Sequence, residues 1–183
     1  MNNIKYWFDN IFKVDAIYKL NLANSFEIPE INKITINSCI RSAIDNSKNI
    51  IYSIILLKLI TNKKPIVCKA KKSIAAFKLR KGVVVGCKVN LRKKSKFDFL
   101  SVFIFLALAK IKNFNFCSIN LEGNISIGIK DLFIFPQVTN SYEKFPKNMS
   151  AVINIKTSKS NKQVSSLLYS ALQIPIKNEK KNN

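Results

Sequence analysis

An alternation of apolar and polar residues predicts β-strands in four stretches of the chain, residues 33–37, 85–92, 125–130 and 151–156. In the first stretch, Ile34 and Ile36 alternate with Lys33, Thr35 and Asn37. Because successive side chains of a strand point to opposite faces, each of these strands has one apolar and one polar side. The pattern predicts an antiparallel sheet with an apolar back and an open polar front.

The stretch 85–92 divides in the same way. Its predicted inward side chains are Val85, Cys87, Val89 and Leu91, and its outward ones are Gly86, Lys88, Asn90 and Arg92. In residues 125–130, Gly128 and Lys130 fall on the polar side. We therefore expect the polar front to extend over several strands.

Apolar residues at helical spacing predict helices that cover the back of the sheet. Ser95 and Ser160 each precede an acid or amide by three residues, which is typical of a helix N-terminal cap. One predicted helix begins at Ser95 and ends at Ile111, and the other begins at Ser160 and ends at Leu172. Two further helices are predicted, one over residues 3–22 and one over Asp45 to Ile60. The second is apolar on most sides, so we expect it to be well buried. The predicted fold class is α+β, a two-layer structure with helices on one sheet face. One domain should span 1–176, followed by a disordered polar tail over 177–183.

Charge changes the picture, because 31 Lys and Arg residues against 10 Asp and Glu residues give the chain a formal charge of +21. Such an excess causes self-repulsion unless a polyanion neutralises it, and nucleic acid is the expected polyanion. Nearly all the cations are lysines, which suit phosphate contacts better than base reading. The abundance of Lys, Ile, Asn and Phe resembles coding bias in an A/T-rich genome, which favours a mitochondrion, with a plastid or an endosymbiont as alternatives.

The basic residues concentrate in residues 63–96, which hold thirteen Lys and Arg residues and no acid. A surface that is merely solvated usually mixes both signs of charge. The window therefore predicts contact with RNA, and the alternative is a solvated face.

The centre of this window, residues 69–82, joins two predicted strands and is longer than a hairpin needs, so it should project. Phe77 either packs across the base of this segment or stacks on a nucleotide. Gly82 and Gly86 are either turn and bulge residues or positions where the backbone approaches phosphate. We call residues 69–82 the basic loop.

The chain lacks the residues that enzymatic and membrane functions usually require. The chain has no histidine, no clustered acids and no Gly-rich phosphate motif, so we expect no catalysis, cofactor or metal. The four cysteines are widely spaced and are interpreted as reduced core thiols. No apolar run is long enough to span a bilayer, so no membrane insertion is expected. Binding to an anionic membrane surface stays a rival interpretation, as does a free-standing basic RNA-binding factor.

Two runs of residues carry a resemblance to a known family. The run KPIVCKAKKSIAAFKLRKG from Lys64 to Gly82, continued by GCKVNLR from Gly86 to Arg92, resembles the signature of large-subunit ribosomal protein family five, the bacterial-type 5S rRNA-binding protein. Residues 28–37, 123–130, 134–136 and the C-terminal strand and helix to Ile176 fit in the same order.

The resemblance implies a structural protein of the large ribosomal subunit that binds 5S rRNA and adjacent large-subunit rRNA through the open sheet face. It implies that the basic loop reaches toward the peptidyl-site tRNA, near a small-subunit head protein across an intersubunit bridge. The candidate RNA-binding residues are Lys33, Thr35, Asn37, Lys63, Lys64, Lys69, Lys88, Asn90 and Arg92. The candidate tRNA-facing residues are Lys71, Lys72, Ser73, Phe77, Lys78, Arg80, Lys81 and Gly82.

The chain departs from the family pattern at three places. Lys63 stands where the family usually has Gln, and Asn90 where it usually has Thr. Leu121-Glu122-Gly123 replaces Gly-Arg-Gly.

Overall fold

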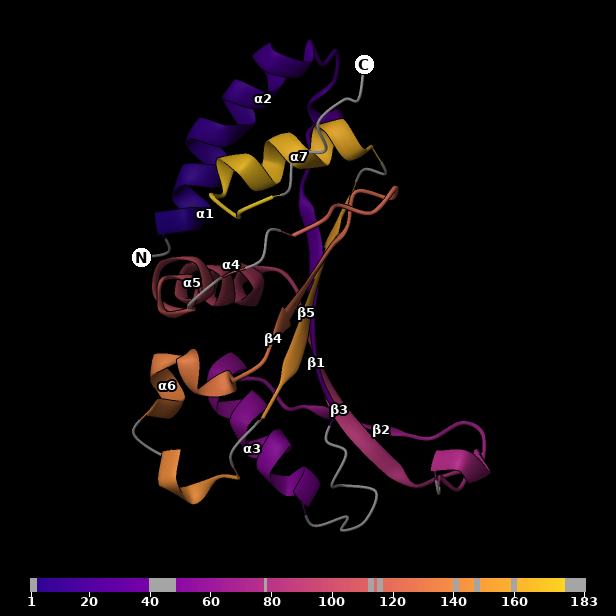
Figure 1. Cartoon of the computed structure of the whole chain (residues 1–183). Coiled ribbons are helices and arrows are strands. Elements are labelled where there is room, and N and C mark those ends of the chain that lie inside the picture. Colours follow the sequence, from indigo (N-terminus) through magenta and orange to yellow (C-terminus); the bar gives the residue numbers. More distant parts are fainter. Residues whose placement is uncertain are drawn as a thin grey trace. The chain divides into compact units, whose positions relative to one another are not determined.

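The computed structural model describes residues 3–39, 49–77, 79–111, 114, 117–139, 142–146, 149–158 and 161–176. In this part of the chain, strands form a sheet in the order β2-β3-β1-β5-β4 (Figure 1). Their bounds are β1 Ile31–Cys39, β2 Ile66–Lys69, β3 Val84–Leu91, β4 Ile125–Ile129 and β5 Ala151–Thr157. The predicted α+β class with an antiparallel sheet is confirmed, and each predicted stretch of alternation coincides with a strand.

The chain divides into two compact units. The first unit contains Met1–Ile34, Arg92–Ile127 and Asn154–Asn183, and the second contains Thr35–Leu91 and Gly128–Ile153. The extent of a single domain over 1–176 stays a prediction, and the expected tail at 177–183 lies outside the described residues.

The first unit begins with a helical segment whose core-facing residues lie four positions apart. It comprises α1 (Asn3–Trp7), a π-helical stretch (Phe8–Phe12) and α2 (Lys13–Leu20), which confirms the predicted helix. Its buried residues are Ile4, Phe8, Phe12 and Ala16. An α-helix has 3.6 residues per turn, so a spacing of four would drift around it. The wider π turn keeps all four side chains on the core side.

Both predicted serine caps in the first unit are wrong. The helix α4 (Lys94–Val102) follows Lys93, whose φ of 51° turns the chain sharply after β3, and Ser95 lies inside the first turn. A π-helical stretch (Phe103–Ala107) and α5 (Leu108–Lys110) continue it. The helix α7 (Lys162–Ala171) is capped by Asn161, whose side chain accepts a hydrogen bond from the Gln163 N–H. Ser160 lies outside the described residues, one position before this cap.

The second unit packs α3 (Ile50–Thr61) against β3 (Figure 1). The predicted helix over 45–60 is confirmed from Ile50 onward, and residues 45–48 lie outside the described part. Its expected burial is only partly correct. Leu56 and Leu57 are fully buried, whereas Ile51, Ile55 and Leu59 are exposed along one face. A short helix, α6 (Pro136–Thr139), contacts α3 in this unit, with Val138 buried. No helix among the described residues is long and apolar enough to cross a bilayer.

The backbones of β1 and β3 approach each other closely at Gly86. A Cβ atom built on Gly86 would lie 2.5 Å from the carbonyl oxygen of Ser38. The β2–β3 register pairs Cys68 with Gly86 and Lys69 with Val84, so Val85 has no partner on β2. The irregular register explains why Val85 is only half-buried, against the predicted inward position, while Gly86 is buried. Gly86 therefore serves contact between strands, not contact with phosphate.

Replacing Gly86 with alanine should destabilise the fold by about 1–3 kcal/mol, because the added methyl group meets a backbone atom that cannot move cheaply. The matched control is Gly128→Ala, since a Cβ there meets nothing within 4 Å. The control should stay within about 0.5 kcal/mol of the wild type. Urea unfolding curves of the two variants compare them directly, and equal stabilities would contradict the close approach.

Candidate nucleic-acid interface

The described part of the basic loop is a hairpin extension between β2 and β3. The Ala70 N–H donates to the Val83 carbonyl at 2.8 Å, and the Gly82 N–H donates to the Ala70 carbonyl at 3.0 Å. Further out, Ile74 and Leu79 exchange two backbone hydrogen bonds of 2.9 and 3.1 Å. Figure 1 shows the hairpin extending beyond β2 and β3, as predicted from its length.

Two small residues shape the turn at the base of this hairpin. The Ser73 hydroxyl accepts a hydrogen bond from the Lys81 N–H at 3.0 Å, so this predicted tRNA-facing residue also holds the loop together. Gly82 has a φ of 90°, a conformation that side chains rarely adopt. Gly82 is therefore a turn residue, which is one of the two interpretations considered for it.

The loop presents cations and apolar groups to solvent together. The side chains of Lys71, Lys72, Arg80 and Lys81 are exposed. Phe77 is 66% exposed, so the interpretation that it packs across the loop base is wrong. The reason is that Phe77 ends a short 3-10 turn at the far end of a two-stranded hairpin, which has no interior. Lys78 lies outside the described residues.

The polar front of the second unit consists of side chains from β1 and β3. Thr35, Asn37 and Lys88 are half-buried, and Asn90 is exposed. The Thr35 hydroxyl donates to the Asn90 side-chain carbonyl at 2.9 Å, which joins the two strands on this face. The back is sealed, with Ile36 and Ser38 of β1 buried.

The remaining candidate residues lie at strand ends. Lys63 and Lys64 precede β2, Lys69 ends it, and all three are exposed. Lys33, half-buried on β1, and Arg92, exposed just after β3, belong to the first unit. The second unit thus brings together seven of the nine predicted RNA-binding residues and the described part of the basic loop.

A hollow of about 540 Å³ lies in the second unit, beside the front. Its lining includes Asn37, Cys39, Gly86, Gly128 and Lys130. Gly128 and Lys130 were not among the predicted site residues, although the alternation over residues 125–130 places both on the polar side. Gly128 leaves open space on this face, because a Cβ built there would meet nothing within 4 Å.

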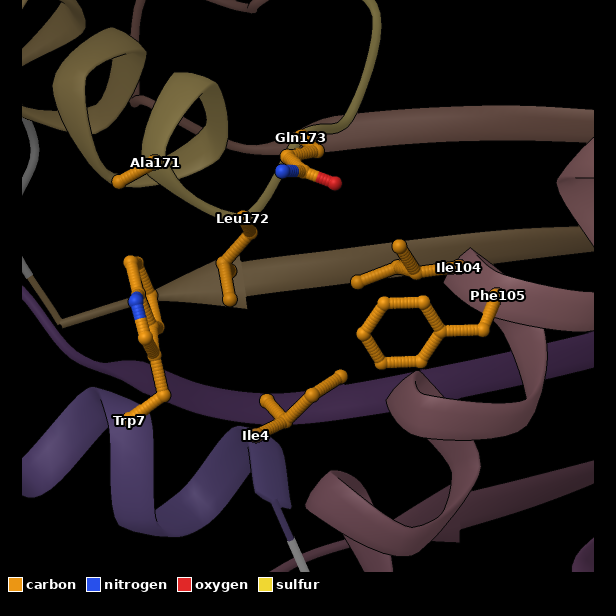
Figure 2. A pocket seen from close by; sticks show the side chains of 7 residues that line it. All are labelled: Ile4, Trp7, Ile104, Phe105, Ala171, Leu172 and Gln173. Carbon is orange, nitrogen blue, oxygen red and sulfur yellow. The ribbon is translucent and has the colours of Figure 1, made fainter.

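The first unit has a hollow of different chemistry, with a volume of about 250 Å³. Figure 2 shows its lining residues, Ile4, Trp7, Ile104, Phe105, Ala171, Leu172 and Gln173. No charged side chain lines this hollow. It therefore offers nothing that neutralises phosphate.

The prediction that all four thiols lie in the core is wrong for one of them. Cys87 and Cys117 are buried and Cys68 is half-buried, but Cys39 is exposed. Cys39 directly follows the buried Ser38 on β1, and successive side chains of a strand point to opposite faces, so Cys39 lies on the polar face. Burial raises the pKa of both the Cys87 and the Cys117 thiols to about 11. Within the described ranges, no group of three or more metal-ligating side chains could hold a metal ion.

Comparison with protein families identifies the chain. Residues 24–80 match the family described as ribosomal protein L5, and residues 84–176 match the family that describes the C-terminus of the same ribosomal protein. The chain belongs to the ribosomal protein L5 family. Members of this family are structural, non-enzymatic constituents of the large ribosomal subunit and bind rRNA. The predicted resemblance is thereby confirmed.

Relatives of the L5 family match almost the whole chain. Large ribosomal subunit protein uL5m of Reclinomonas americana is 41% identical over 179 residues, which is 96% of this chain and 98% of the relative. Large ribosomal subunit protein uL5 of Buchnera aphidicola (subspecies Cinara cedri) is 38% identical, covering 92% and 95%. The uL5 protein of Geotalea daltonii is 35% identical, covering 86% and 89%.

Thiol alkylation at about pH 8 should modify Cys39 first and leave Cys87 and Cys117 unmodified in the folded protein. With a pKa of about 11, roughly one in a thousand of the buried thiols is ionised at that pH, and the thiolate is the reactive form. Peptide mapping after a timed iodoacetamide pulse measures the order. All four thiols should react in urea, and equal labelling without urea would contradict the burial of Cys87 and Cys117.

Proposed function

We propose that this L5 family protein holds 5S rRNA, where its ribosome contains one, and adjacent large-subunit rRNA on the polar front of the second unit. The observation that carries the proposal is the unpaired charge of the basic loop. Lys71, Lys72, Arg80 and Lys81 are exposed, and no carboxylate in the described part of the chain forms an ion pair with them. Such cations gain most from a phosphate-rich partner.

The contacts are mainly to the RNA backbone. Lysine ammonium groups are point charges that bind phosphate, whereas bidentate reading of guanine favours arginine. The front adds neutral donors and acceptors, Thr35, Asn37 and Asn90, between the charged groups. This mixture suits recognition of a folded RNA by its shape and ribose-phosphate surface.

The basic loop reaches toward the peptidyl-site tRNA in this proposal, close to a small-subunit head protein across an intersubunit bridge. The ordered hairpin supports it, because paired backbone groups hold the exposed cations away from the sheet. Exposed Phe77 gives the loop an aromatic surface that can stack on a nucleotide.

The protein functions in a mitochondrial ribosome. The composition predicts an A/T-rich genome, and the relative that is 41% identical over nearly the full chain is the mitochondrial-type protein uL5m. Its full-length match to large-subunit proteins also favours a subunit constituent over a free-standing RNA-binding factor.

Changing Lys71, Lys72 and Arg80 together to glutamine should reduce the salt dependence of rRNA binding. Each lost phosphate contact lowers the slope of log affinity against log salt by about 0.7–0.9, so the slope should fall by up to about 2–3. Filter binding of a large-subunit rRNA transcript over a salt series measures it. The matched control changes Lys58, Lys110 and Lys144, which are also exposed, to glutamine. Equal slopes for the two variants would argue against the loop as an RNA contact.

Phe77→Ala should weaken association with peptidyl-site tRNA on the assembled ribosome while leaving the unfolding free energy unchanged. Stacking of one base on an aromatic ring contributes about 1–3 kcal/mol, and a side chain that is 66% exposed adds little to the core. Phe77→Tyr keeps a ring and is the control. A loss of stability in Phe77→Ala, or equal tRNA occupancy in both variants, would contradict this role.

A further inference from the structure

Thr35 and Asn90 form a pair on the polar front whose geometry has a direction. They lie on β1 and β3, which are neighbours in the sheet. The Thr35 Oγ1 donates to the Asn90 Oδ1 at 2.9 Å. An amide carbonyl can only accept, so the hydroxyl must be the donor. With the carbonyl bonded to Thr35, the Nδ2 end of the amide group is free.

The free end of the Asn90 amide is a donor. Its Nδ2 carries two N–H groups, and no acceptor within the described part of the chain bonds to it. Asn90 is exposed while Thr35 is half-buried. Half a rotation of the amide would make Nδ2 the donor to the Thr35 hydroxyl and would present the carbonyl outward, which cannot bond to phosphate oxygens.

We infer that Thr35 is a positioning residue for rRNA recognition, because it holds the Asn90 amide so that Nδ2 offers two N–H donors to acceptor atoms of the RNA. Those acceptors are phosphate oxygens, ribose hydroxyls and base carbonyl groups. The inference rests on the proposed function and adds to it a contact that does not depend on net charge.

A structural role alone does not account for this pair. A neutral hydrogen bond at an exposed side chain adds little net stability, because water replaces it when it is lost. The core side of β1 is formed by other residues, among them the fully buried Ile36. Removing the Thr35 hydroxyl should therefore change RNA binding more than it changes folding.

The test compares four full-length proteins, the wild type, Thr35→Val, Thr35→Ser and Asn90→Ala, and adds the double variant of Thr35→Val with Asn90→Ala. Each is titrated with a large-subunit rRNA transcript over a salt series, and thermal unfolding is recorded. Thr35→Val should lower affinity roughly 3- to 10-fold at every salt concentration with an unchanged salt slope, the range of one ordinary hydrogen bond. Thr35→Ser should restore binding to within about 2-fold.

The double variant should bind no more weakly than Asn90→Ala alone, because Thr35 acts through Asn90. Wild-type affinity in Thr35→Val, equal losses in the valine and serine variants, or additive losses in the double variant would each overturn the inference. If Thr35→Val unfolds, Thr35→Ala replaces it in the test, because alanine also removes the hydroxyl without adding a charge. Failure of the wild type to bind rRNA would instead overturn the proposed function itself.

Discussion

The packing of α3 on the sheet in the second unit determines which side chains lie on the polar front. Side chains of a strand alternate between faces, so burying one set leaves the other set outside. Ile36 and Ser38 lie on the buried side, and therefore Thr35 and Asn37 lie on the front. A slip of one residue along β1 would exchange the two sets and remove the site.

Polar groups within the buried side of this unit resist such a slip. The Ser38 hydroxyl lies 3.1 Å from the Ser53 hydroxyl of α3 and donates to the Ser150 carbonyl at 2.9 Å. A buried hydroxyl without a partner is costly, so these bonds favour one register of β1. The close approach at Gly86 acts in the same sense, since no other residue fits beside the Ser38 carbonyl.

The first unit shows how helices adapt to a core that their sequence period does not match. The buried side chains of the N-terminal helix recur every four residues, and a π-helical stretch absorbs the difference from 3.6. Residue spacing predicted the helix but not the π turn, because the turn depends on tertiary packing, in which the Phe8 ring lies against the rings of Phe12 and Phe97. The predicted helix caps are wrong for a related reason. The chain after β3 turns at Lys93 with a positive φ, so the helix begins before the serine that resembled a cap.

The sequence by itself determined the class of fold, the polar front, the position of the basic loop and the membership of the L5 family. The first three follow from local period and composition, in which each residue is informative without its distant neighbours, whereas the family follows from the resemblance of the runs 64–82 and 86–92. Only the tertiary structure decided that Phe77 is exposed, that Cys39 leaves the core, that Gly86 serves strand contact, and that Thr35 bonds to Asn90. Each of these depends on what another strand or turn places beside the residue, and 55 positions of chain separate Thr35 from Asn90. Alternation indicates the face on which a side chain lies, whereas its partner is chosen by the pairing of strands.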